Sequence, residues 1–147
     1  MTPDHIQLIQ SSHRLLQPIA APAAALFYNN LFRIDPTLRP LFQADLGDQG
    51  ARLMAMIGSA VGLLGRPDAL LPVLRTLGQR HAGYGVQAAH YTSVGTALLQ
   101  TLAQGLGDAF TPATRDAWTA LYTLISQTMQ HGAAAAPGPA PALPLAA

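Results

Sequence analysis

His81 is the histidine of this sequence that is best placed to bind a metal or a cofactor. It follows Leu74 and Leu77 on the apolar face of an expected helix, so its imidazole is directed into the protein interior. Two glycines follow it closely and are expected to end the helix. One ring nitrogen can donate to the carbonyl of Leu77, four residues back, as histidines that ligate metals usually do. Taken alone, the pattern also fits an ordinary buried histidine.

The composition excludes several classes of site. The 147 residues include no cysteine, which excludes disulfide scaffolds, cysteine-ligated metal centres and thiol nucleophiles. The net charge is +1 and no two of the eight arginines are adjacent, which disfavours a nucleic-acid-binding surface. The N-terminus does not resemble a signal peptide, and the uncharged stretch 81–107 is too polar for a membrane span. We therefore expect a cytoplasmic, soluble protein with no nucleic-acid or membrane partner.

Helix start and stop signals predict an all-α domain over residues 1–131. Thr2 and Pro3 open the first helix, and Pro18 and Pro22 interrupt it. Further helices are expected over 22–34, 36–42, 48–64, 67–82, 88–106 and from 111 onward, with a loop at 43–48. Residues 132–147 are rich in Ala and Pro and carry no charge, which predicts a disordered tail.

Six stretches resemble the globin family in their order and spacing: LFYNNLF, DPTLRPLFQ, DQGARLM, LGQRHAGYGV, HYTSVG and FTPATRDAW. The resemblance covers about Asp4 to His131. It is strongest to bacterial single-domain haemoglobins and to the haemoglobin domain of flavohaemoglobins, and the last stretch is also similar to neuroglobin. It implies the globin fold, with six to eight helices around a haem b group. The haem would be non-covalent, because no cysteine is present for thioether attachment.

The resemblance also implies roles for individual residues. His81 matches the proximal iron ligand, and Tyr28 and Gln49 match the distal pair that faces a bound gas. Ala24 and Gly50 match small residues where two helices cross closely. The residues expected to contact haem are Phe42, Gln49, Arg52, Leu53, Leu77, Arg80, His81, Val86 and Tyr91, with the two arginines as partners of the propionates.

Four of these residues also have a simpler structural alternative. Tyr28 also fits a core aromatic residue bonded to a backbone carbonyl, and Gln49 an exposed residue near a loop. Arg52 and Arg80 also fit solvated helix-surface charges. If the globin role holds, a Tyr28 hydroxyl bond to oxygen is worth about 1.5–3 kcal/mol, which predicts tight oxygen binding.

The sequence departs from the flavohaemoglobin pattern on the proximal side. Tyr91 matches the proximal tyrosine of that family, but its partner glutamate falls at Ala133, and the chain contains no Glu. Asp116 lies 17 residues earlier, roughly 25 Å along a helix, so it is a poor substitute. We therefore expect a more neutral proximal imidazole than in flavohaemoglobins.

The sequence leaves four candidate functions. The first is reversible binding of oxygen, NO and CO, for oxygen scavenging or NO detoxification. Nitric oxide dioxygenation would need an external reductase, because no reductase domain follows the globin-like region in this sequence. A gas or redox sensor acting through a partner protein is the alternative from another class. A haem-free helical interaction module is the last, and it predicts a colourless protein.

Overall fold

The computed structural model describes residues 1–42 and 45–134, which form six α-helices and three short 3₁₀ helices. The α-helices are α1 (Pro3–Leu16), α2 (Ala20–Ile34), α3 (Leu46–Gly62), α4 (Pro67–Gly83), α5 (Ala88–Leu106) and α6 (Pro112–Ala134). The 3₁₀ helices are η1 (Gln17–Ile19), η2 (Pro36–Leu41) and η3 (Gly107–Ala109). No strand occurs in these two ranges, and none of their helices combines the length and hydropathy that a bilayer crossing requires.

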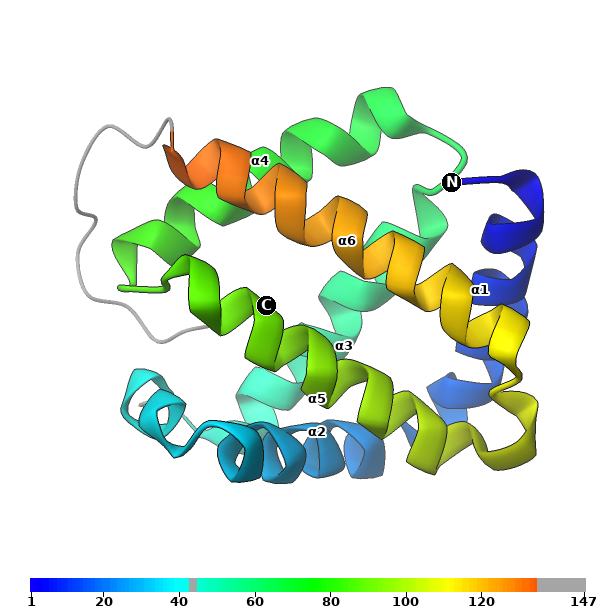
Figure 1. The fold of residues 1–147 in the computed structure, drawn as a ribbon, viewed down its shortest axis with the longest axis horizontal. Coiled ribbons are helices and arrows are strands. Elements are labelled where there is room, and N and C mark those ends of the chain that lie inside the picture. The colour runs from blue at the N-terminus through cyan, green and yellow to red at the C-terminus, as the bar shows by residue number, and fades with distance from the viewer. Residues whose placement is uncertain (43–44, 135–147) are drawn as a thin grey trace.

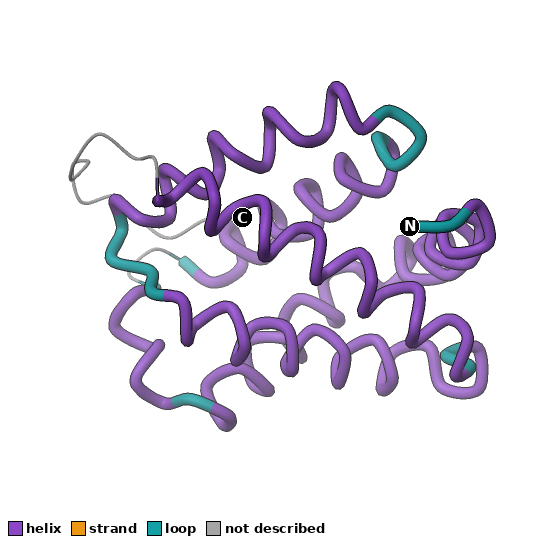
Figure 2. Tube along the Cα trace, turned by 45° about the horizontal axis from the view of Figure 1, so that its top comes forward, coloured by secondary structure: helices purple, strands orange, loops and turns teal. Residues whose placement is uncertain are grey.

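The helices pack as two main pairs joined by α3. In Figure 1 the α4–α6 pair lies opposite the α2–α5 pair, and α3 runs from one pair to the other. α1 packs on α6, and Figure 2 shows α1 at the end of the molecule opposite the C-terminal end of α4. This arrangement leaves the C-terminal end of α4, with His81, facing α5 and α6.

The core forms around α6 and its contacts with α1. Trp118 is 1% exposed, and its indole N–H donates to the Ser12 hydroxyl at 2.8 Å. Ser12 in turn donates to the Leu8 carbonyl at 2.7 Å, so the polar groups brought into this core are paired. Trp118 therefore belongs to the core.

Most predicted helix ends are confirmed, because capping side chains act where the sequence places them. Thr2 accepts a hydrogen bond from the His5 backbone N–H at 3.1 Å, and Thr111 accepts from Thr114 at 3.2 Å. Asp35 accepts from the backbone N–H of Thr37 at 3.1 Å and opens η2.

Three boundaries differ from the prediction. α2 begins at Ala20, two residues early, because Pro22 falls within the first turn, where no helical partner is needed for its nitrogen. The predicted loop at 43–48 is wrong from residue 46 onward, because the Asp45 carboxylate accepts from the Asp48 N–H at 3.0 Å and caps α3 early. α6 continues through residues 132–134, which were assigned to the tail; the rest of the predicted tail, 135–147, lies outside the described residues.

His13, on α1, gives the fold a pH dependence. Its side chain is 7% exposed, and burial lowers its pKa below the ordinary value of 6.5. Below pH 6.5 the unfolded chain therefore binds a proton that the folded chain does not, so the free energy of unfolding falls as the pH falls. We expect His13→Leu to be less destabilised than the wild type between pH 7.5 and pH 5.5 in urea unfolding. His131→Gln, at an exposed position, should keep the wild-type pH dependence.

Candidate functional site

A mostly apolar cavity lies between the two helix pairs. It includes six residues singled out from the sequence: Tyr28, Phe42, Leu53, His81, Val86 and Tyr91. The rest of its wall comprises Phe27, Leu38, Leu41, Met56, Ile57, His90, Val94, Leu98, Tyr122, Ile125 and Met129. Every α-helix except α1 contributes a side chain, and so does η2, so the cavity forms only when these helices are assembled.

His81 enters this cavity from the last turn of α4 with one ring nitrogen already bound. Its Nδ1 donates to the Leu77 carbonyl at 2.8 Å, as the sequence predicted, which leaves Nε2 as the unprotonated nitrogen. Burial lowers the pKa of His81, and the Leu77 carbonyl opposes that shift by stabilising the protonated ring. The imidazole is therefore neutral at neutral pH and has a lone pair available to a metal.

The turn after α4 supports this orientation. α4 ends at Gly83, and Gly85 takes φ +90°, a conformation that glycine adopts without a steric cost. The chain thereby turns back, and the Val86 N–H donates to the His81 carbonyl at 3.1 Å. The predicted helix stop at the two glycines is confirmed.

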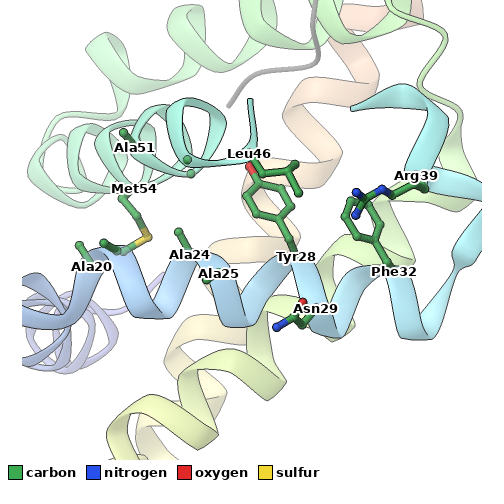
Figure 3. A pocket seen from close by; sticks show the side chains of 13 residues that line it. Ala20, Ala24, Ala25, Tyr28, Asn29, Phe32, Arg39, Leu46, Ala51 and Met54 are labelled. Atoms are coloured by element: carbon green, nitrogen blue, oxygen red, sulfur yellow. The ribbon is translucent and has the colours of Figure 1, made fainter. Parts of the chain in front are cut away.

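Tyr28 contributes from α2, on another side of the cavity. Its ring packs against Phe27 and Phe42, with centroids 5.2 and 5.4 Å away, and it is 5% exposed. Burial raises its pKa to about 12, so the hydroxyl stays protonated and can donate a hydrogen bond. Figure 3 shows this hydroxyl directed toward Leu46, at the beginning of α3.

Gln49, on the first turns of α3, is fully buried, at 0% exposure. Neither its amide nitrogen nor its amide oxygen has a hydrogen-bond partner among the described residues. A buried amide left unpaired costs roughly 1–3 kcal/mol, so this side chain is suited to a polar group that the protein itself does not provide. The exposed alternative for Gln49 is therefore wrong.

α2 and α3 cross in close contact at Ala24 and Gly50, as the resemblance implied. A Cβ at Gly50 would lie 2.9 Å from the Ala24 Cβ and 3.7 Å from the Tyr28 Cε2. On the outer side of this crossing lies an alanine-lined groove of about 510 Å³, and Tyr28 belongs to the walls of both the groove and the cavity (Figure 3). Among the described residues, the lining of the groove includes no histidine or carboxylate, whereas His81 lines the smaller cavity.

The crossing makes a stability prediction. Gly50→Ala places a methyl group too close to Ala24 and is expected to lower the free energy of unfolding by about 1–3 kcal/mol. Gly62→Ala is the matched control, because it makes the same change on the same helix with no atom within 4 Å. It should leave stability unchanged or raise it by up to about 1 kcal/mol. Urea unfolding of both variants checks the difference, and equal effects would contradict it.

Two tyrosines, Tyr91 on α5 and Tyr122 on α6, also line the cavity. The Tyr91 hydroxyl is buried without a hydrogen-bond partner among the described residues, and the Tyr122 hydroxyl donates to the Tyr91 carbonyl at 2.6 Å. Burial raises the pKa of both phenols, so both remain neutral. Ala133, where the resemblance places a glutamate, lies in the last turn of α6.

Four of the predicted haem contacts are not part of the cavity wall: Gln49, Arg52, Leu77 and Arg80. Leu77 acts on the cavity through its carbonyl, which holds His81. Arg52 and Arg80 are exposed on their helices, which fits the simpler alternative of solvated charges equally well.

Three of the wall residues that were not expected at the site are His90, Tyr122 and Met129. His90 lines the cavity, while its Nδ1 accepts from the Gln87 backbone N–H at 3.0 Å and caps α5. Tyr122 and Met129 enter the cavity wall from α6. Their spacing with Ile125 on one face of α6 was the available signal.

The metal-ligating side chains at the cavity indicate which kind of group it could bind. Within residues 1–42 and 45–134, no three His, Asp or Glu side chains gather into a set that would hold a bare metal ion. A single neutral imidazole is instead suited to a metal that brings its own equatorial ligands, which is the case for haem iron. The apolar walls of the cavity fit such a group.

Comparison with known proteins gives the family. The family described as globin matches residues 25–129. This chain belongs to the globin family. This globin is 30% identical to the flavohemoprotein of Vibrio cholerae over 130 residues. The matched region covers 86% of this chain and 33% of the relative. This globin therefore spans about a third of the length of the curated relatives it matches.

Solved structures share the fold of this globin over nearly its whole length. An engineered carbene transferase from Rhodothermus marinus, described as a candidate nitric oxide dioxygenase, has a TM-score of 0.83 and 26% identity, covering 92% of this chain and 94% of that one. A bacterial globin from Campylobacter jejuni has a TM-score of 0.79 and 24% identity, covering 91% and 97% of the two chains. The predicted all-α globin fold and the prediction of haem as cofactor are confirmed at the level of the family.

Proposed function

We propose that this globin binds haem through His81 and reversibly binds oxygen, and also NO and CO, on the side facing Tyr28. The observation that carries the proposal is the His81 imidazole, which is neutral, held at Nδ1 by the Leu77 carbonyl and placed at an apolar cavity. When bound, haem supplies an iron centre that coordinates small gases. The residues of the chain decide how firmly the cofactor and the gas are retained.

His81 orients and holds the cofactor from one side. Its bond to Leu77 fixes both the tautomer and the ring rotation, so little rotational freedom remains to be lost on binding. The hydroxyl of Tyr91 has no carboxylate beside it among the described residues, and Ala133 offers none. The imidazole therefore keeps a neutral character, and we expect a weaker peroxidase-like activity than in flavohaemoglobins.

The candidate hydrogen-bond donors on the other side are Tyr28, which lines the cavity, and Gln49, which lies outside its wall. Tyr28 keeps its proton, since burial raises its pKa to about 12. Gln49 has a free amide N–H₂ in a site with no water-exposed surface of its own. Donors in such a low-dielectric environment stabilise partial negative charge on a ligand more strongly than water does.

The visible absorption spectrum of the purified protein tests this function. Reduced protein under nitrogen should give a five-coordinate haem band that shifts when oxygen is admitted and returns when oxygen is removed. A sharp six-coordinate ferrous spectrum would contradict an open gas site. Protein that stays colourless after haem is added would contradict the function as a whole and favour the haem-free helical module.

Nitric oxide dioxygenation is the second candidate, favoured by the likeness to flavohemoproteins and to a structure described as a candidate nitric oxide dioxygenase. It consumes oxygen and NO and yields nitrate, and each further turnover needs one electron from an external reductase. Repeated NO consumption with NADH and a flavin reductase would support this activity. A single stoichiometric burst would favour a gas binder, or a sensor that acts through a partner protein.

A further inference from the structure

α4 and α6 cross with their backbones in direct contact at two glycines. A Cβ at Gly78 would lie 1.9 Å from the carbonyl oxygen of Met129, and a Cβ at Gly132 would lie 2.3 Å from the carbonyl oxygen of Arg75. Neither distance is possible for a real side chain, so both positions require glycine as long as the helices keep this separation. The contacts are reciprocal, since each helix supplies one glycine and one carbonyl three residues away. Figure 1 shows the two helices, α4 and α6, side by side.

This crossing is continuous with the cavity. Gly78 directly follows Leu77, whose carbonyl accepts from His81 Nδ1, and it lies one helical turn before His81. On the other helix, Met129 contributes the backbone that Gly78 contacts and a side chain to the cavity wall. The separation of α4 and α6 therefore also sets the distance between His81 and the α6 side of the cavity.

We propose that Gly78 and Gly132 are positioning residues, which set how closely α4 approaches α6 and thereby place the His81 imidazole in the cavity. The imidazole has little means of correcting a displaced helix, because its ring rotation is fixed by Leu77 of the same helix. A displacement of α4 would move the ring and its hydrogen-bond partner together. The inference rests on the proposed role of His81 as the haem ligand.

Gly132→Ala tests the proposal, with Gly105→Ala as its matched control. A Cβ at Gly105 would meet Ile19 and Leu16 at 3.5 and 3.7 Å, which are ordinary contacts. We expect Gly132→Ala to release haem at least about tenfold faster than the wild type, as when the residues that support a metal ligand are altered. Its iron–imidazole band in the resonance Raman spectrum should shift, whereas Gly105→Ala should match the wild type in both measurements.

Freeing the imidazole from α4 separates a positioning role from general loss of packing. In His81→Gly supplied with imidazole, the iron ligand is no longer attached to α4. Adding Gly132→Ala in this background should therefore change the rate of haem release and the Raman band little. The double-mutant cycle should then show a large coupling between the two positions.

An equal effect of Gly132→Ala in the His81 and His81→Gly backgrounds would overturn the proposal. So would a Gly132→Ala protein that is identical to the wild type, and the proposed function would then still stand. A wild type without any haem signal would instead remove the proposed function, and this inference with it.

A second measurement covers the case in which Gly132→Ala does not fold. In His81→Gly with imidazole, no covalent link joins α4 to the bound haem, so only packing holds the helix. We expect the amide hydrogens around Gly78 to exchange as slowly as those around Met129 on α6. Exchange near Gly78 as fast as that of exposed loop amides would show that the crossing does not hold α4, and would overturn the proposal.

Discussion

His81→Ala is expected to remove tight haem binding. The cavity keeps its apolar walls in this variant, but the only neutral imidazole held at Nδ1 by a helix carbonyl within the described residues is lost. Loss of the ligand itself should exceed the effect of altering a residue that supports a ligand, so we expect more than about a hundredfold weaker haem affinity. Titration of the haem-free protein with haem, followed by visible absorption, measures the change.

His90→Ala is the matched control for this substitution. His90 also lines the cavity, but its Nδ1 caps α5 by accepting the Gln87 N–H at 3.0 Å. Its replacement should cost about 1 kcal/mol of stability through the lost cap and leave the haem stoichiometry unchanged. Equal losses of haem in the two variants would mean that His81 has no special role, and retention of haem by His81→Ala would reject it as the ligand.

The sequence was sufficient to predict the helices and the hydrogen bond that holds His81. Periodicity placed His81 on an apolar face, and the spacing to Leu77 correctly predicted the hydrogen bond at Nδ1. Both depend on local geometry, in which a residue contacts its neighbours three and four positions away. The early start of α3 could also have been found, since Asp45 precedes Asp48 by three residues in the manner of a helix cap.

Contacts between distant segments could not be derived in this way. The hydrogen bond from Tyr122 to the Tyr91 carbonyl and the contact of Gly132 with Arg75 depend on how α6 crosses other helices, which no local pattern specifies. The extension of α6 through Gly132 has the same origin, because packing on α4 outweighs the weak helix propensity of glycine. The roles of Tyr28 and Gln49 depended on the family resemblance from the outset.

Tyr28→Phe is expected to accelerate oxygen dissociation by about 10-fold to about 150-fold, which corresponds to a hydrogen bond of about 1.5–3 kcal/mol. The substitution removes only the hydroxyl, and the ring can keep its contacts with Phe27 and Phe42. The association rate should change much less, because the bond forms after the ligand has entered. Stopped-flow mixing of the oxygenated protein with excess CO measures the dissociation rate.

Tyr122→Phe is the control that shows whether the effect of Tyr28→Phe depends on where in the cavity the hydroxyl is removed. Tyr122 lines the same cavity, but its hydroxyl is used in the bond to the Tyr91 carbonyl at 2.6 Å, so the variant should lose stability and keep the wild-type oxygen dissociation rate. CO carries less partial negative charge than oxygen, so its dissociation should respond weakly to Tyr28→Phe. If Tyr28→Phe releases oxygen at the wild-type rate, the donor to oxygen is another group, and Gln49, with its unpaired buried amide, becomes the residue to replace next.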